Sequence, residues 1–316
     1  MSPRMKPLTL LMVSGLGVAN VGCSAAPARG ETSVARQKPD STAQEPDWTA
    51  VERALGRRGQ LQEGGLYRVG MPRTDLAVTV RGVPIRAALS LGSWIGFKSS
   101  GGGKVLVMGD LVLTESELNP VLSRLQQGGV GQTAVHKHLP DHSPPLWWTH
   151  VRAQGDPIAI AATMREALAL TSTPGSAPAA PGSAETPFGI DTAAVRRALG
   201  REGRVTGGVY QVSAGRAETI RALGIDLAPA MGVGTVMSFQ PTGNGRAVIN
   251  GDFAMIATEV DSVLRALREN RIEVVELHNH LVDEEPRLYF VHFWAHDEAI
   301  TLARGLRKAL DRTNVR

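Results

Sequence analysis

Seven of the eight histidines in the chain fall in two stretches of similar pattern. One of them, LHNHLVDEEPRLYFVHFW, runs from Leu277 to Trp294 and carries His278, His280 and His292. Imidazole is the commonest metal-ligating side chain in proteins, and residues two apart on a β-strand point to the same side. The stretch therefore predicts a binding face for a metal or a small ligand.

Strand geometry predicts how this face is built. In the segment IEVVELHNHLV, the period of two places His278 and His280 on one side with Glu276. The opposite side, expected to face the core, holds Val275, Leu277 and Leu281. The segment LYFVHFW should return antiparallel, with His292 opposite or diagonal to His280. Three neutral imidazoles with a carboxylate or water would suit zinc or another divalent transition metal.

Glu284 is a further candidate in this stretch. The spacing His278-x-His280-x-x-x-Glu284 resembles the first metal motif of cupins, in which two histidines and a glutamate bind metal with a later histidine. That resemblance makes Glu284 a candidate ligand. A second hypothesis is a metal-dependent hydrolase, in which Glu284 acts as a general base on bound water. A third is a non-catalytic interaction protein whose histidine faces dock on each other or on a partner.

The other histidine stretch, VHKHLPDHSPPLWWTHVR, repeats this pattern earlier in the chain. His136, His138 and His150 align in register with the three histidines of the later stretch. The alignment extends without a gap over most of each half, so the chain contains a tandem duplication. The second copy is the better candidate metal site, because its carboxylates Glu276, Glu284 and Glu285 align with Ala134, His142 and Ser143 of the first.

The duplication fixes the domain organisation. We predict a first repeat over 47–171, a linker rich in proline, alanine and serine over 172–187, and a second repeat over 188–316. Each repeat should be an α+β domain, an antiparallel sheet with two main helices, because short strands joined by turns alternate with amphipathic segments. The helices are expected at 116–127 and 258–270, with a closing helix at 297–312 in the second repeat. A closing helix covers one sheet face and leaves the other for a site or for the other copy.

Several recurring residues have a structural interpretation. Asp110 and Asp252 precede the amphipathic helices, where an acid would stabilise the helix N-terminus. Glu117 and Glu259 are expected as first-turn or capping acids. The segment SSGGGK at 99–104 is predicted as a hairpin turn, because it lacks the spacing and the following helix of a phosphate loop.

The N-terminus predicts export. Basic residues precede a short apolar run and small residues, and residues 1–23 resemble a lipoprotein signal peptide in which Cys23 is lipidated. Residues 24–46 then read as a flexible tether. We expect an extracytoplasmic lipoprotein anchored to a cell-envelope membrane, or otherwise a secreted protein. Because Cys23 is the only cysteine, the fold must be held by packing without internal disulfides.

Composition and motifs narrow the function. A formal charge of +4 on 316 residues is too small for a nucleic-acid footprint. The segments INGDF and LHNHLVDEEPRLYFVHFW, together with the lipobox-like N-terminus and the duplication, resemble the bacterial LppY/LpqO lipoprotein family. That resemblance implies an exported protein with a shared domain and supplies no reaction, cofactor or substrate. The sequence therefore favours an anchored protein that binds a divalent metal or small ligand, with a protein partner as the alternative.

Overall fold

The computed structural model describes residues 45–175 and 188–316, which lie within one compact unit. The predicted signal peptide with Cys23, nearly all of the predicted tether and most of the predicted linker lie outside the described residues. In the described parts, the chain forms two tandem α+β domains, each a mostly antiparallel sheet with helices, so the predicted fold class is confirmed.

Repeat one contains a six-stranded sheet, a small three-stranded sheet and four helices among its described residues. The large sheet has the order β1-β2-β5-β6-β9-β7, and the small one β4-β3-β8. Its elements are α1 (Trp48–Leu55), β1 (Gln60–Gln62), β2 (Leu66–Pro72), β3 (Val78–Val80), β4 (Val83–Ile85), α2 (Ala87–Ser90), β5 (Gly92–Gly101), β6 (Lys104–Thr114), α3 (Glu115–Gln127), β7 (Gly131–His136), β8 (His142–Ser143), β9 (Leu146–Gly155) and α4 (Pro157–Leu168).

Repeat two has the same plan, with the large sheet in the order β10-β11-β14-β15-β18-β16 and a small sheet β13-β12-β17. Its elements are α5 (Thr192–Leu199), β10 (Gly203–Thr206), β11 (Val209–Ala214), β12 (Arg221–Ala222), β13 (Ile225–Asp226), the 3-10 turn η1 (Pro229–Met231), β14 (Thr235–Gly243), β15 (Arg246–Met255), α6 (Val260–Glu269), β16 (Glu273–His278), β17 (Glu284–Glu285), β18 (Tyr289–Glu298) and α7 (Ala299–Leu310). Thus α3, α6 and α7 occupy the predicted segments.

Turn chemistry sets the strand pairing. The central hairpin of repeat one joins β5 to β6 through Gly101, Gly102 and Gly103, all with positive φ. Glycine adopts this conformation without the steric cost that a Cβ atom would bring. The predicted hairpin at 99–104 is therefore confirmed, and it aligns the two longest strands of the sheet.

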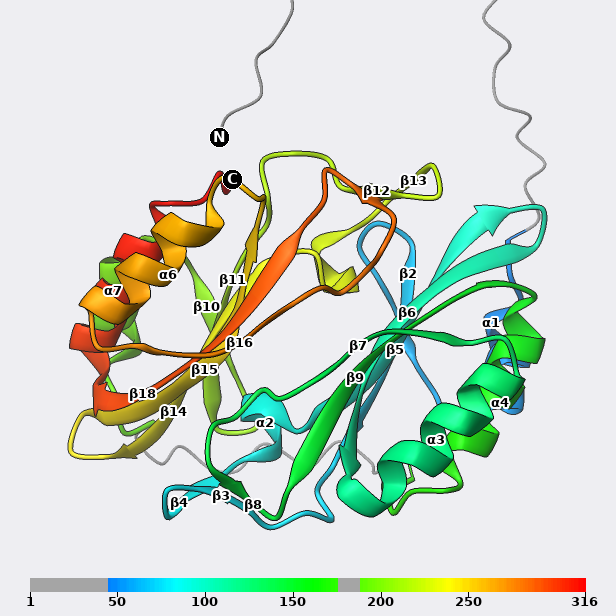
Figure 1. The fold of residues 1–316 in the computed structure, drawn as a ribbon, viewed down its shortest axis with the longest axis horizontal. Coiled ribbons are helices and arrows are strands. Elements are labelled where there is room, and N and C mark those ends of the chain that lie inside the picture. The colour runs from blue at the N-terminus through cyan, green and yellow to red at the C-terminus, as the bar shows by residue number, and fades with distance from the viewer. Residues whose placement is uncertain (1–44, 176–187) are drawn as a thin grey trace, which may run out of the picture. The chain divides into compact units, whose positions relative to one another are not determined.

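Each large sheet buries both faces, against different partners. One face packs on helices: α3 and α4 lie against the first sheet, and α6 and α7 against the second (Figure 1). The opposite faces of both sheets share two mixed cores. Leu66 and Met108 of repeat one pack with Phe290 of repeat two, and Trp148 packs in a cluster with Trp294. The face that the closing helix leaves is thus covered by the other copy.

A buried arginine recurs in both repeats and anchors the turn into α3 in repeat one and into α6 in repeat two. Arg73 donates to both carboxylate oxygens of Glu117, at 2.8 and 3.1 Å, and Arg216 pairs with Glu259 in the same way. Glu117 also accepts from the backbone N–H of Thr114 at 2.9 Å, and Glu259 from that of Ile256. The predicted capping role is confirmed for Glu117, which forms a capping box with Thr114. Glu259 is the N-cap residue of α6, but its side chain makes no cap hydrogen bond to that helix. The arginines beneath both glutamates were not anticipated.

The prediction that Val275, Leu277 and Leu281 share one core-facing side is wrong for the first two. Leu277 is 48% exposed, and Val275 packs at the edge of a core shared with repeat one. The reason is a β-bulge between Val274 and Glu276, which reverses the alternation of side chains along an edge strand. Leu281 is buried, in the other mixed core.

Candidate metal centre

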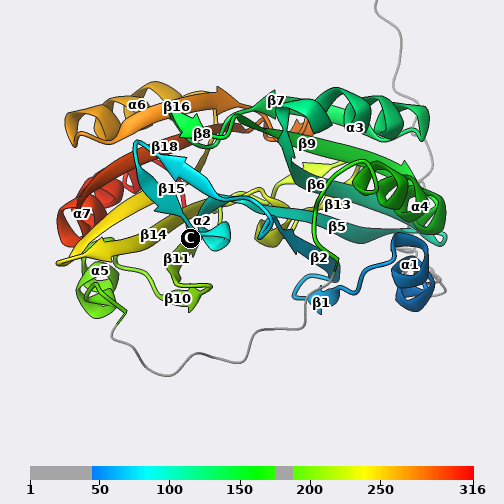
Figure 2. The ribbon, with the colours of Figure 1, turned by 90° about the horizontal axis from the view of Figure 1, so that it is seen from below.

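Alternation along the return strands brings the histidines of the two repeats together. In β18, Val291 and Phe293 face the helices, so His292 faces the other repeat between Phe290 and Trp294. In β9 the same alternation turns Val151 toward the helices and His150 toward repeat two. Figure 2 shows the two halves of the chain from a second direction, with β16 and β7 side by side.

Six histidines pack in cross-repeat pairs. The rings of His136 and His278 are stacked with centroids 4.0 Å apart. The His138 ring lies 3.8 Å from that of His292. In the equivalent pair with the repeats exchanged, the rings of His150 and His280 lie 3.9 Å apart. All six predicted histidine ligands therefore meet in one place, and each copy completes the surroundings of the other.

Asp110 and Asp252 belong to this cluster, and the prediction that they stabilise helix N-termini is wrong. Asp110 lies within β6, four residues before the N-cap Thr114, and its side chain is buried. Its carboxylate is 3.3 Å from Nε2 of His138, and that of Asp252 is 2.9 Å from Nε2 of His280. We call the six histidines with these two aspartates the histidine cluster.

The sequence did contain a signal for the two aspartates. Each follows a glycine on a buried strand, in MGD and NGD, and an acid held inside an apolar strand is more telling than one beside a helix. Cross-strand pairing explains the placement, because Asp110 lies directly opposite His150 and Asp252 directly opposite His292. Directly opposed residues on antiparallel strands project to the same side of the sheet.

The spacing of the donor atoms suits ligands that share an ion. Nε2 of His136 lies 3.1 Å from Nε2 of His138, and the pair His278 and His280 repeats this distance. Adjacent ligands of a tetrahedral ion with bonds near 2.0–2.1 Å lie about 3.4 Å apart. Four overlapping groups of three donors have all ligand atoms within 4.8 Å of one another. They are His136/His138/His292, His136/His150/His278, Asp110/His138/His150 and Asp252/His278/His280.

Backbone carbonyls orient two of the imidazoles. Nδ1 of His280 lies 2.5 Å from the carbonyl oxygen of Gly232, and Nδ1 of His292 lies 2.9 Å from that of Gly251. A carbonyl accepts only, so each Nδ1 carries the proton and Nε2 presents its lone pair to the cluster. Metal-ligating histidines commonly have this outer hydrogen bond, which fixes the tautomer and the ring orientation.

Several buried polar atoms of the cluster have no hydrogen-bond partner among the described residues, in a pattern common to both repeats. The atoms are His136 Nδ1, His278 Nδ1, His150 Nε2, His292 Nε2, Asp110 Oδ1 and Asp252 Oδ1. A buried polar group left unsatisfied costs roughly 1–3 kcal/mol. Three pairs of such atoms thus recur at corresponding positions of the two repeats.

Burial sets the protonation of the cluster. It lowers the pKa of His136, His138 and His278 well below the usual value, and the neighbouring imidazoles lower it further. Burial also lowers the pKa of His150 and His292, against a backbone carbonyl that raises it. At neutral pH these rings are uncharged, which is the form that binds metal.

The carboxyl of Asp110 responds in the opposite direction. Burial raises its pKa well above the usual value, and the nearby charge of Asp252 raises it further, while Arg68 lowers it. Two carboxylates this close in an apolar surrounding repel one another. A bound cation would remove that repulsion and favour the ionised form.

Glu284 lies outside the four donor groups. Its Oε1 accepts from the backbone N–H of Leu288 at 3.0 Å, and β17 pairs with β12 of the small sheet. His142 makes the equivalent contact in repeat one, where its Nε2 accepts from the backbone N–H of Leu146 at 2.9 Å. The two aligned side chains thus anchor equivalent loops.

The predicted register of the second stretch is also wrong. His292 lies opposite Glu276, and the strand β16 ends at His278, so His280 lies beyond it. The reason is the connection: residues 279–288 do not form a tight turn, because β17 leaves to join the small sheet. His278 and His292 nevertheless bring their rings to 4.6 Å as diagonal neighbours.

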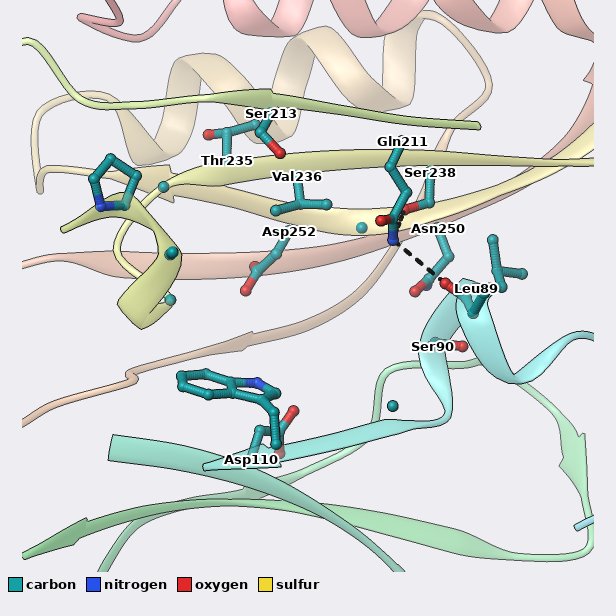
Figure 3. A pocket seen from close by; sticks show the side chains of 18 of the residues that line it. Leu89, Ser90, Asp110, Gln211, Ser213, Thr235, Val236, Ser238, Asn250 and Asp252 are labelled. Atoms are coloured by element: carbon teal, nitrogen blue, oxygen red, sulfur yellow. Dashed lines mark hydrogen bonds between the residues drawn. The ribbon is translucent and has the colours of Figure 1, made fainter. Parts of the chain in front are cut away.

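A cavity of about 740 Å³ opens onto the cluster. Asp110 and Asp252 face it from the two opposing sheets, with Ser238 and Asn250 farther along the wall from repeat two (Figure 3). Its lining also includes His138, His150, His280 and His292. Four of the six histidines and both aspartates therefore border this cavity.

Comparison with known proteins places this arrangement in a family. The family described as Domain of Unknown Function (DUF1259) matches twice, over residues 49–170 and 193–312. The chain belongs to this family. Each match covers one repeat, so the chain contains two domains of this family in tandem.

Other comparisons add little about function. The chain matches no curated protein. A trimeric bacterial microcompartment shell protein, PduB, is similar at 12% identity, with 80% of this chain and 90% of that chain covered and a TM-score of 0.20. Within the described residues, no helix is both long and apolar enough to cross a membrane.

Proposed function

We propose that this protein binds divalent transition-metal ions, with zinc as the best-fitting metal, at the histidine cluster between its two repeats. Each repeat supplies one aspartate and three histidines, residue types that zinc prefers, and these form groups of three donors, two of which draw on both repeats. The observation that carries the proposal is the set of unpartnered ring nitrogens and carboxylate oxygens that recurs in both repeats, on residues that form groups of three closely spaced donors.

A purely structural role for these residues explains the pattern less well. Neutral imidazoles can stack and hydrogen-bond to one another, and the cross-repeat ring contacts support the hypothesis of histidine faces that dock on each other. Docking alone leaves six buried polar atoms unsatisfied, at roughly 1–3 kcal/mol each. A metal ion satisfies lone pairs on both repeats and also holds the two faces together.

The two repeats supply matching ligands. The earlier expectation that the second repeat is the better site rested on Glu276, Glu284 and Glu285. The ligand groups of the described residues contain none of these three and instead contain Asp110 in one repeat and Asp252 in the other. We therefore propose sites that draw on both repeats equally.

Hydrolysis with Glu284 as base is less favoured. The Oε1 atom of Glu284 accepts a backbone hydrogen bond in the loop that precedes β18. The accessible carboxylates beside the cluster are those of Asp110 and Asp252. Any general base acting on a metal-bound water would come from these two.

We further propose that the protein acts outside the cytoplasm as a lipoprotein of the LppY/LpqO type. The support is in the sequence: the basic and apolar N-terminus and the lipobox-like position of Cys23. The anchor would join the membrane to the first repeat through the tether at 24–46. Metabolic labelling with a fatty acid tests it, since a Cys23→Ala variant should lose the label and leave the membrane fraction.

Elemental analysis tests the proposed function. The chain, purified without a histidine tag, should contain a divalent transition metal in stoichiometric amount. Zinc affinity is then measured by competition with a chromophoric chelator in His150→Ala and His292→Ala, one ligand from each repeat. Both should bind zinc about 100-fold more weakly or worse, since even the loss of an outer hydrogen bond costs up to about 100-fold.

His296→Ala is the matched control. His296 is exposed on β18, and its Nε2 lies 3.0 Å from the hydroxyl of Thr242, away from the histidine cluster. Its removal should leave zinc affinity unchanged. Metal content at background level, with the same zinc affinity in all three variants and the original chain, would disprove metal binding.

A further inference from the structure

The cavity above the histidine cluster is lined differently by the two repeats. Repeat one contributes the guanidinium of Arg68 and the ring of Trp94, and the aligned residues of repeat two are Gln211 and Val236. All four lie in the lining. Repeat two also contributes Glu202 and Arg204, one charge of each sign, so Arg68 and Trp94 are what distinguish the repeat-one wall around a centre to which both repeats contribute alike.

Arg68 is held in place without a carboxylate partner. Its guanidinium lies 4.0 Å from the centroid of the Trp94 ring, and its NH1 donates to the carbonyl oxygen of Ala230 at 2.5 Å. Within the described residues it forms no ion pair. Burial lowers its pKa to about 10, although the charge of Asp110 acts to raise it. This is a fixed, partly desolvated cation with unused donors.

A guanidinium in this condition favours an oxyanion. Its planar fork matches the two oxygens of a carboxylate or phosphate, and hydrogen bonds between charged groups are the strong ones. Asp110, on the side of the cluster, is close enough to affect the charge of Arg68 but does not pair with it. Arg68, Asp110 and four histidines of the cluster line the same cavity, so an anion held by Arg68 would share that cavity with a metal ion at the cluster.

The opposite wall offers hydrogen bonds to the rest of a ligand. Both hydrogens of the Asn250 amide go to backbone, to His138 at 2.8 Å and Phe293 at 3.0 Å, so its oxygen remains as an acceptor. On the same wall, Nε2 of Gln211 donates to the hydroxyl oxygen of Ser238 at 3.3 Å (Figure 3). These groups suit hydroxyl or amide substituents. A cavity of about 740 Å³ holds a small organic molecule.

We propose that this cavity binds a small polar molecule carrying an oxyanion, with the oxyanion fixed by Arg68 and directed onto the metal ions of the histidine cluster. The inference rests on the proposed function, because the second anchor is the metal. It goes beyond it by assigning the chemical class of the ligand and the residue that recognises it. Arg68 is a binding residue here, and Trp94 positions it.

Cobalt substitution gives a direct test. The chain is loaded with Co²⁺, and its visible absorption is titrated with succinate and, separately, with inorganic phosphate. At least one of these should shift the cobalt bands with saturation, and the stronger binder identifies the carboxylate or phosphate class. In Arg68→Gln the dissociation constant should rise about 10-fold to 100-fold, the range for a charge-assisted hydrogen bond. Arg68→Lys, which keeps the charge and loses the fork, should fall between.

Arg265→Gln is the matched control, since it removes an equal charge from an exposed position on α6. It should bind the anion as the original chain does. Equal anion affinity in Arg68→Gln and the original chain, with equal cobalt content, would overturn the inference and leave metal binding intact. The same holds if neither anion changes the spectrum of the cobalt-loaded chain. Failure of the original chain to bind cobalt or zinc would instead overturn the proposed function.

Discussion

The two repeats are alike at the histidine cluster and unlike around it. Each contributes an aspartate and three histidines from equivalent strand positions, with the same pattern of unpartnered atoms. In the cavity, by contrast, Arg68 and Trp94 align with Gln211 and Val236. The cluster thus draws equivalent groups from both copies, whereas the Arg68 guanidinium has no counterpart at the aligned position of repeat two.

Cross-repeat packing gives the physical reason for the likeness. His138 packs on His292, and His150 on His280, so a change in one copy alters the surroundings of the other. Substitutions of residues in direct contact do not have additive effects on stability. The cavity wall can differ between the copies because the contact of Arg68 across the repeats, to the carbonyl oxygen of Ala230, needs only a backbone oxygen from repeat two.

The largest expected effect concerns acid stability of the metal-free protein. Burial lowers the pKa of His136, His138, His150, His278 and His292 from 6.5, so the unfolded chain binds protons there that the folded chain does not. Stability should therefore fall as pH drops through 6.5 toward the folded values. Urea unfolding of chelator-treated protein between pH 7.5 and 5, in steps of about half a unit, measures this.

The titration of Asp110 changes stability with pH in the direction opposite to that of the histidines, by one proton. Its raised pKa means that the folded state holds a proton which the unfolded state has lost above pH 3.8, so this contribution falls as pH rises. Because five histidines act against one aspartate, stability should still fall overall as the pH drops. His150→Ala and His292→Ala should each flatten the pH dependence, by similar amounts if the repeats are equivalent. If only one of the two variants changed the slope of stability against pH, the two repeats would not be equivalent at the histidine cluster.

Much of the fold was predictable because the chain is duplicated. The aligned halves gave the two domains, and the main helices, the capping glutamate of α3 and the glycine hairpin follow from local patterns that packing preserves. The six histidines were also predictable, because three recur in register while most of their neighbours changed.

The rest depended on contacts that local patterns do not encode. A bulge at Val274 reversed the expected alternation in β16, and β17 joined a separate sheet, so the register of His292 was missed. Asp110 read as a helix-capping acid because proximity along the chain suggested it, whereas its position opposite His150 depends on strand pairing. That Arg68 has no carboxylate partner among residues 45–175 and 188–316 is likewise a property of the assembled cavity.

An intermediate effect is expected at the glycines that precede the two aspartates. A Cβ atom on Gly109 would lie 2.6 Å from the carbonyl oxygen of Trp94, and one on Gly251 would lie 2.0 Å from that of Val236. Overpacking of this kind costs roughly 1–3 kcal/mol and sometimes more. Gly109→Ala should therefore destabilise the protein within that range, and Gly251→Ala by a larger amount, as measured by urea unfolding at pH 7.5.

This pair sharpens the comparison because the glycines stand in equivalent places with unequal room. Gly70→Ala, in a strand where a Cβ atom would meet nothing within 4 Å, is the control and should have little effect. If Gly109→Ala and Gly251→Ala were equally mild, the close approach of β6 to β5 and of β15 to β14 would be less tight than the distances indicate.

The smallest effect is expected at Glu284, where the two repeats use different side chains for one task. Glu284 and His142 each accept a hydrogen bond from the backbone N–H of a buried leucine four residues on. Glu284→Gln keeps an acceptor oxygen, so metal content should not change and stability should shift by no more than about 0.5 kcal/mol. Glu284→Ala removes the acceptor and should cost roughly 1–3 kcal/mol, again without loss of metal. Elemental analysis and urea unfolding of both variants separate these outcomes. A loss of zinc in Glu284→Gln would make this carboxylate a ligand, and the second repeat would then hold metal in a way that the first, with His142, cannot.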